Sequence, residues 1–256
     1  MIPKLGCVPY LNAKPLLEGL SYPVAGMVPS RLYESYQQGE FDAALLSSVD
    51  ILSMPDISVV DHVAIASKGN VHSVIMAYSG ELKSIKKVHL DPASHTSNVL
   101  LKIILREFFN ISPEYVQFQT DETSFLSDGA AHLFIGDRAI SFRKRTSSES
   151  IHLMDLGDEW FRKTGFPFVF AMWALKSDYT NKKYLSDALR NAKMLGLSRR
   201  QEIASRTPDP TFSLRYLTEF IHYDLEENEK KGLQLFADYL RKYRFVEPLG
   251  NSLVYF

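Results

Sequence analysis

A single cysteine, the lack of long apolar runs and an almost neutral net charge set the first limits on this sequence. Cys7 alone forms no intrachain disulfide and no thiolate metal cluster, and we expect it to be a small buried side chain in the first strand. No segment approaches the roughly 20 apolar residues that a membrane-spanning helix needs. Residues 1–6 show no signal-peptide pattern. We therefore expect a cytoplasmic protein with no membrane partner.

The charges are balanced, with 29 basic and 30 acidic residues and a net charge of −1. This balance gives no electrostatic case for binding nucleic acid or an anionic membrane. The basic run Arg143-Lys144-Arg145 is short, and we expect it to be a solvated loop. Nothing in the composition indicates an oligomeric state.

Motifs for nucleotides, metals and nucleophiles are also missing. No two glycines lie two residues apart, so the sequence has no G-x-G-x-x-G loop, and it has neither a P-loop nor a G-x-S-x-G elbow. The seven histidines include no H-x-x-x-H pair that would suit zinc. We therefore expect a protein that uses no cofactor and no metal.

What the sequence does contain is an alternation of apolar strand-like segments with short helical ones, which is typical of an α/β fold with parallel strands. The pattern restarts after Gly80, so we expect one lobe from residues 1–80 and 171–256 and another from residues 81–170. The expected strands are residues 5–9, 24–28, 41–46, 57–66, 73–78, 86–90, 116–119, 131–135 and 168–175. The fifth and the last of these are the candidate crossings between the lobes.

Residues 88–109 combine an apolar strand, a polar loop and an apolar helix. Pro92 ends the strand, and Ser94, Thr96 and Ser97 are residue types that cap helices. A helix N-terminus offers free backbone N–H groups and a partial positive charge, to which these hydroxyls add donors. The construction suits a small anion, above all a carboxylate. The alternative is an ordinary helix cap without a ligand.

Small polar residues follow other expected strands as well. Ligands of α/β proteins collect at the carboxyl ends of strands, so we expect a polar cleft between the lobes to bring these residues together. They are Tyr10 to Asn12, Ser47 with Ser48, Ser94 to Ser97, and Gly136 with Asp137.

Several longer segments, spread over nearly the whole chain, form a more specific pattern through their order and spacing. They are Gly6-Cys7-Val8-Pro9-Tyr10-Leu11-Asn12 with Pro15-Leu16, Val28-Pro29-Ser30, Asp42-Ala43-Ala44-Leu45-Leu46-Ser47-Ser48, Ser73-Val74, Ala93-Ser94-His95-Thr96-Ser97, Ile135-Gly136-Asp137-Arg138-Ala139, Asp155-Leu156-Gly157-Asp158-Glu159-Trp160 and Thr164-Gly165-Phe166-Pro167-Phe168-Val169-Phe170-Ala171-Met172-Trp173. With these segments the chain resembles the chorismate dehydratase family of the futalosine route to menaquinone.

The resemblance implies a two-lobed, type II periplasmic-binding-protein-like fold with an interlobe cleft, and a carbon–oxygen lyase that removes water from chorismate. The product would be 3-[(1-carboxyvinyl)oxy]benzoate, and because the ring becomes aromatic the reaction needs no cofactor. The sibling family, 1,4-dihydroxy-6-naphthoate synthase, continues differently after the position of Pro167 and remains an alternative. A non-catalytic solute-binding protein for a small anion is another. His72 departs from the glycine-rich family pattern before Ser73, which bears on substrate choice.

The resemblance also implies roles for single residues in binding a small dicarboxylate. We expect Asn12 and Ser73 to be catalytic, with the Asn12 amide orienting the reacting centre or the leaving hydroxyl. His95 is a candidate general base, but histidine is not a fixed feature of this family position, and the substrate's own enolpyruvyl carboxylate is a second candidate. Asp137 is equally well explained as a loop cap. The expected substrate-binding residues are Tyr10, Ser47, Ser94, His95, Thr96, Ser97 and Asp137.

Overall fold

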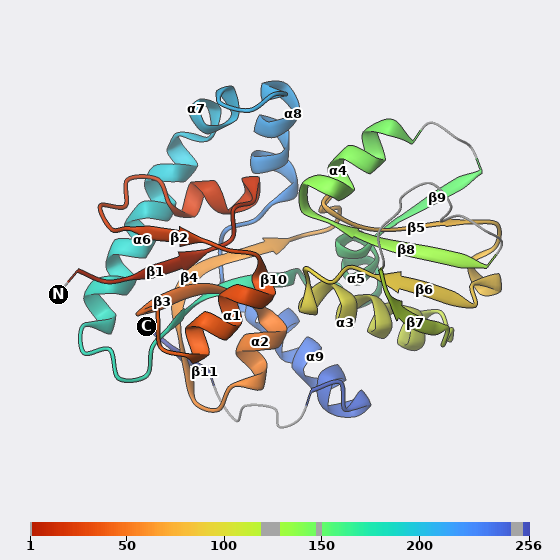
Figure 1. The fold of residues 1–256 in the computed structure, drawn as a ribbon, viewed down its shortest axis with the longest axis horizontal. Helices are drawn as coiled ribbons and strands as arrows, with labels where there is room; N and C mark the ends of the chain where they lie inside the picture. Colours follow the sequence, from red (N-terminus) through yellow and green to blue (C-terminus); the bar gives the residue numbers. More distant parts are fainter. Residues whose placement is uncertain (1, 119–128, 147–149, 247–252) are drawn as a thin grey trace. The chain divides into compact units, whose positions relative to one another are not determined.

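A computed structural model describes residues 2–118, 129–146, 150–246 and 253–256. The chain divides into two compact units (Figure 1). The first unit combines Met1–Lys68 with Phe166–Phe256, and the second is the continuous segment Gly69–Gly165. Each unit is an α/β structure with a mixed sheet of its own, which confirms the expected fold class.

The sheet of the first unit has the strand order β11-β4-β10-β3-β1-β2. Helices α1 and α2 pack against β3, α9 packs against β10, and α6 packs against β4 and η1. The strands are β1 (Leu5–Cys7), β2 (Val24–Gly26), β3 (Ala43–Ser47), β4 (Ile57–Ser67), β10 (Phe168–Leu175) and β11 (Leu253–Tyr255). The helices are η1 (Leu11–Leu16), α1 (Pro29–Gln37), α2 (Ser48–Ser53), α6 (Lys182–Ser198), α7 (Arg200–Ser205), α8 (Pro210–Arg215), η4 (Tyr216–Phe220) and α9 (Glu227–Tyr243).

The sheet of the second unit has the order β7-β6-β8-β5-β9. Its strands are β5 (Val74–Ser79), β6 (Lys87–Leu90), β7 (Glu114–Gln117), β8 (Ala130–Ile135) and β9 (Ile151–Asp155). Its helices are η2 (Leu82–Ser84), α3 (His95–Ile103), η3 (Ile104–Phe108), α4 (Gly136–Arg145) and α5 (Leu156–Thr164). Helices α4 and α5 were not expected from the sequence, and Arg143-Lys144-Arg145, expected in a loop, form the last turn of α4.

Five strands of the first sheet have the topology of the second sheet, and the first sheet adds β11, which pairs in parallel with β4. In the first, β1 pairs in parallel with β2 and β3, and β10 pairs antiparallel with β3 and β4. In the second, β6 pairs in parallel with β7 and β8, and β5 pairs antiparallel with β8 and β9. The expectation of parallel pairing is therefore wrong for β5 and β10, because an apolar run indicates a buried strand but not its direction.

The boundaries between the units also differ from the expected ones. We expected the lobes to meet after residues 80 and 170, but the division falls after Lys68 and after Gly165. The reason is strand pairing: β5 hydrogen-bonds only within the second sheet, and β10 pairs with β4 of the first sheet from Phe168 onward. Ser73, expected in the first lobe, therefore belongs to the second unit.

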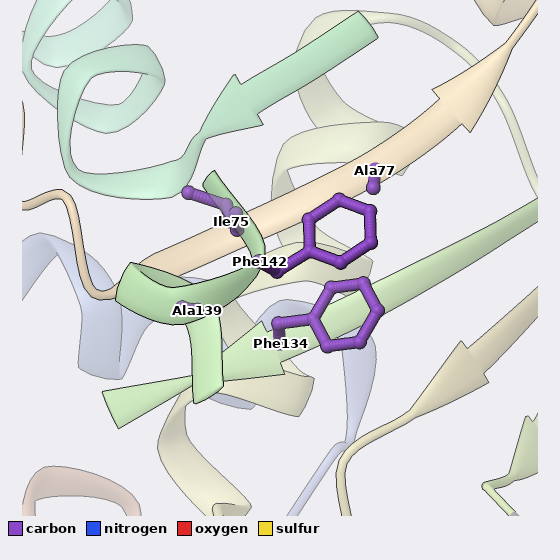
Figure 2. Close-up of a cluster of buried hydrophobic side chains, with 5 residues drawn as sticks. All are labelled: Ile75, Ala77, Phe134, Ala139 and Phe142. Carbon is purple, nitrogen blue, oxygen red and sulfur yellow. The ribbon is translucent and has the colours of Figure 1, made fainter. Parts of the chain in front are cut away.

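Buried apolar side chains fix α4 on its sheet. Ile75 and Ala77 from β5 and Phe134 from β8 meet Ala139 and Phe142, which lie three residues apart on α4 (Figure 2). The rings of Phe134 and Phe142 stack with centroids 4.4 Å apart. Truncating a buried phenylalanine of this kind costs about 3–5 kcal/mol, so this contact holds α4 firmly against β5 and β8.

Candidate active site

Three segments that carry expected site residues lie at one edge of the second sheet. The loop before α3 follows the carboxyl end of β6, and α4 begins where β8 ends. Ser73 precedes β5, whose first residue Val74 is opposite Ile135 at the end of β8. The parallel and antiparallel pairings therefore bring the start of α3, the start of α4 and Ser73 to the same edge, as expected for a ligand site of an α/β sheet.

The N-terminus of α3 is capped by its own serines. The Ser94 hydroxyl accepts a hydrogen bond from the Ser97 N–H at 3.1 Å and donates to the Ser97 Oγ at 2.9 Å. Ser94, Thr96 and Ser97 are all buried, whereas His95 is exposed. The expected helix cap is confirmed. At the positive end of the helix, backbone N–H groups are therefore surrounded by small polar side chains in fixed positions.

Asp91 shapes the loop that leads into this helix. Its side chain is 1% exposed and accepts a hydrogen bond from the Ala93 N–H at 2.9 Å. Its backbone oxygen accepts from the Asn98 amide at 2.8 Å. The guanidinium of Arg138 on α4 lies 3.5 Å from the second carboxylate oxygen and balances the buried charge. The loop and α4 are thus joined by an ion pair, which limits how far Asp91 weakens the positive field of the helix terminus.

Ser73 is held from two sides of the same edge. Its backbone oxygen accepts a hydrogen bond from the Gly136 N–H at 2.7 Å, and its N–H donates to the Val71 oxygen at 2.7 Å. The side chain is buried. Asp137, one residue into α4, is exposed and lines a depression of about 500 Å³ along that helix. Ser73 is therefore fixed in the sheet edge, while Asp137 stands in the first turn of a helix.

In the first unit, η1 carries Asn12 directly after β1. Tyr10 precedes this helix, has no side-chain cap, and its backbone oxygen accepts from the Ala13 N–H. Helix α6 packs closely on η1 because Gly196 has no side chain: a Cβ there would collide with the Pro15 carbonyl. Asn12 itself is half-buried, and its side-chain oxygen is buried without a hydrogen-bond partner among the described residues. A buried polar oxygen of this kind is suited to meet a ligand.

Ser47 ends β3 and caps α2. Its hydroxyl donates to the Asp50 carboxylate at 2.7 Å and accepts from the Asp50 N–H at 3.4 Å. The neighbouring Ser48 hydroxyl donates to the Val169 oxygen of β10 at 2.6 Å. Ser47 is half-buried, so the structure gives it a capping role at the same sheet edge as Asn12. Its expected contact with substrate stays a prediction.

Cys7 and a second depression of the first unit add nothing to the candidate site. Cys7 is buried as expected, and burial raises the pKa of its thiol to about 12, which removes it as a nucleophile. Within the described ranges, no group of three or more His, Cys, Asp or Glu side chains suits a metal ion. A depression of about 300 Å³ between α2, α9 and β11 contains no expected site residue. No helix in the described ranges is long and apolar enough to cross a membrane.

Comparison with known proteins gives a consistent assignment. A family model described as menaquinone biosynthesis matches residues 3–242. The chorismate dehydratase of Thermus thermophilus is 33% identical over 92% of this chain and 94% of its own. The chain belongs to the menaquinone biosynthesis family.

Solved structures support the fold. A protein from Archaeoglobus fulgidus aligns with a TM-score of 0.73 at 14% identity, covering 95% of this chain and 98% of its own. A Candida albicans protein described as having the generic periplasmic binding protein fold aligns with a TM-score of 0.60 at 12% identity, over 99% and 98% of the two chains. The chain therefore has the periplasmic-binding-protein fold.

Sequence reasoning missed the acidic residues that organise the second unit. Asp91 follows an apolar strand and precedes Pro92, a pattern that would have indicated a side chain bonded to its own loop. Asp155 caps α5, and Gly165 ends that helix with φ 74°. An aspartate before a helical run and a glycine after it are the usual signals of helix ends. The contacts between Asp155 and the turn before Ser73 have no local signal.

Proposed function

We propose that this protein is a chorismate dehydratase, a hydro-lyase that converts chorismate to 3-[(1-carboxyvinyl)oxy]benzoate. The observation that carries the proposal is membership of the menaquinone biosynthesis family over residues 3–242, together with 33% identity to a chorismate dehydratase over 92% of the chain. The geometry at the start of α3 is compatible with it, because this substrate carries two carboxylates.

The reaction removes the C3 hydrogen and the C4 hydroxyl of chorismate. The ring carboxylate activates the C3 hydrogen, so loss of that proton puts negative charge onto the carboxylate. The C4–O bond then breaks, the hydroxyl leaves as water after taking up a proton, and the ring becomes aromatic. The enzyme has to bind a dianion, stabilise the growing charge with fixed donors and hold the hydroxyl in place.

The start of α3 is the proposed binding site for one carboxylate. Backbone N–H groups and the hydroxyls of Ser94, Thr96 and Ser97 lie at the positive end of the helix dipole. These donors are already fixed by the Ser94–Ser97 hydrogen bonds and by Asp91, so they need little reorganisation when charge develops. Exposed His95 is proposed as a substrate contact at the same terminus.

Asn12 and Ser73 are the proposed catalytic residues. The buried side-chain oxygen of Asn12 can accept a hydrogen bond from the C4 hydroxyl and hold it in the orientation for departure. The Ser73 hydroxyl is proposed to contact the reacting ring. The substrate's enolpyruvyl carboxylate is the proposed proton acceptor at C3. Tyr10, Ser47 and Asp137 are proposed as further contacts to the substrate.

The decisive experiment is incubation of the purified protein with chorismate, after dialysis against a chelator, followed by product analysis. We expect chorismate to be converted to the aromatic enol ether with loss of one equivalent of water. Loss of activity after chelation would contradict the expected independence from metal. Turnover of the cyclised futalosine derivative instead of chorismate would assign the protein to the sibling enzyme, and binding of a small anion without turnover would indicate a solute-binding protein.

The pathway and the compartment belong to the same proposal. The sequence resemblance supports a place in the futalosine route to menaquinone and a location in the cytoplasm. A strain that lacks the gene should stop making menaquinone and recover when supplied with the aromatic enol ether. Cell fractionation that places the protein outside the cytoplasm would contradict the proposed location.

A further inference from the structure

The turn before Ser73 contains a residue in an unfavourable backbone conformation. His72 has φ 62°, in the left-handed region that side chains with a Cβ rarely adopt. The Ser73 N–H donates to the Val71 oxygen at 2.7 Å, so the hydrogen bond spans two residues around His72. This is the pattern of a γ-turn with positive φ, a strained form. Such a turn persists only where its surroundings hold it.

The carboxylate of Asp155 supplies that hold, beside the Asn70 side-chain oxygen, which accepts from the same His72 N–H at 3.1 Å. Its Oδ1 accepts from the Val71 N–H at 3.0 Å, and its Oδ2 accepts from the His72 N–H at 2.8 Å. Only 7% of Asp155 is exposed, and Arg143 of α4 lies 3.4 Å from Oδ2. Burial raises the pKa of Asp155, while the hydrogen bonds and Arg143 oppose that rise. Hydrogen bonds to an ionised carboxylate are stronger than hydrogen bonds between neutral groups. The two bonds from Asp155 therefore hold the turn in place.

The same carboxylate caps a helix. Its Oδ1 also accepts from the N–H groups of Gly157 and Asp158, at 3.1 and 3.2 Å, in the first turn of α5. Asp155 ends β9 opposite Ile75 of β5, the strand that Ser73 precedes. One side chain thus joins the end of β9, the start of α5 and the strained turn. A capping role alone would need Gly157 and Asp158 but neither Val71 nor His72.

We propose that Asp155 is the positioning residue for Ser73, acting by holding the left-handed turn at His72. The proposal rests on the proposed function, because it requires Ser73 to act on chorismate. With the carboxylate in place, the Ser73 backbone is fixed between the Val71 and Gly136 hydrogen bonds and its hydroxyl keeps one direction. Without it, His72 relaxes to negative φ and carries Ser73 away from its position.

The test is a comparison of Asp155→Asn in three backgrounds: wild type, His72→Gly and His72→Ala. In the wild-type background we expect kcat to fall roughly 10- to 100-fold, the size of effect that a small misplacement of a reacting group produces. Glycine adopts positive φ without strain, so in the His72→Gly background Asp155→Asn should lower kcat less than about threefold. In the His72→Ala background, which keeps the Cβ, the full loss should remain. Asp158→Asn removes the same charge from the same helix terminus and is the matched control, with kcat unchanged.

An equal loss of kcat in all three backgrounds would show that Asp155 only caps α5 and would overturn the proposal, as would an unchanged kcat in Asp155→Asn alone. If Asp155→Asn does not fold, the same comparison applies to folding: recovery of cooperative unfolding with His72→Gly but not with His72→Ala supports the proposal, and any other pattern overturns it. Amide hydrogen exchange of Val71 to Ser73 is read in parallel. It should accelerate in Asp155→Asn and recover only with His72→Gly, so it decides the positioning of Ser73 even if the wild type does not turn over chorismate.

Discussion

The loops after β1 and β6 have corresponding places in their two sheets, because each strand lies between two parallel neighbours. The structures of the two loops are different. The loop after β6 leads into a nine-residue α-helix that Ser94 caps. Hydrogen bonds from the Ala93 N–H to the Asp91 side chain and from the Asn98 amide to the Asp91 backbone oxygen fix its conformation. The loop after β1 begins a short 3₁₀ helix with no side-chain cap, and leaves the Asn12 side-chain oxygen without a partner among the described residues.

This difference suggests that the two corresponding loops have different roles, one in substrate binding and the other in the chemical step. The Ser94–Ser97 cap is already formed, so the start of α3 presents the same donors before and during the reaction, which suits uniform binding of a carboxylate. The Asn98 side-chain oxygen in this segment, like that of Asn12, is buried without a hydrogen-bond partner among the described residues. A half-buried amide with an unused oxygen is suited to an interaction that is completed only when the substrate reacts. We therefore expect the loop after β6 to act mainly on binding and Asn12 to act mainly on the chemical step.

The largest expected effect is that of Asn12→Ala. If Asn12 holds the leaving hydroxyl in the transition state, kcat should fall by about 10²–10³, as for other single polar groups that stabilise a transition state. KM should change little. Steady-state kinetics with chorismate measure both. Lys14→Ala, an exposed change in the same 3₁₀ helix, is the control, and full activity in Asn12→Ala would remove this residue from the mechanism.

At the start of α3 we expect substitutions to change KM more than kcat. Replacing Thr96 and Ser97 together by alanine removes hydroxyls whose hydrogen bonds to a charged group are worth about 1.5–3 kcal/mol each. KM should therefore rise at least about tenfold, with a smaller change in kcat. Thr211→Ala, an exposed change in the first turn of α8, serves as the control. Unchanged kinetics in the double variant would mean that these hydroxyls are only caps.

The smallest expected effect concerns pH and is confined to the second unit. His89 of β6 stacks on His132 of β8 with ring centroids 4.2 Å apart, and burial followed by Lys87 lowers the pKa of His89 from 6.5. A lowered pKa means that the unfolded state binds the proton more readily. The free energy of unfolding should therefore be highest above pH 6.5 and fall as the pH drops through the folded-state pKa.

Urea unfolding at pH 7.5 and pH 5.5 measures this dependence in the wild type and in His89→Gln. The variant should show a flatter dependence on pH below 6.5 than the wild type. Identical pH dependence in His89→Gln and the wild type would contradict the account of the stacked pair.

The elements that could be predicted from sequence are those with a strong local pattern. The apolar runs of β4 and β10 and the Ser94 cap of α3 are of this kind. Helices α4 and α5 were missed, and α4 buries little more than Ala139 and Phe142 in a polar segment. The direction of β5 and the unit boundary depend on which strands pair, and this is a property of the whole sheet.

The candidate site divides in the same way. The helix start at Ser94 was predictable because it is encoded by adjacent residues, whereas the expected contacts of Ser94, Thr96 and Ser97 with substrate stay predictions. The role of Asp155 depends on a hydrogen bond to Val71, 84 positions away in the sequence. The buried, unpartnered oxygen of Asn12 depends on the folded surroundings of η1 and not on its sequence neighbours. Contacts between residues that are far apart in the sequence cannot be predicted from local sequence patterns.

The most direct test of the division between the two loops is the dissociation constant of the aromatic product, measured by calorimetry for the wild type, Asn12→Ala and the Thr96→Ala/Ser97→Ala variant. The product keeps both carboxylates but lacks the leaving hydroxyl. We expect Asn12→Ala to bind it with wild-type affinity and the double variant to bind it at least about tenfold more weakly. Weakened binding in Asn12→Ala together with wild-type affinity in the double variant would contradict the account.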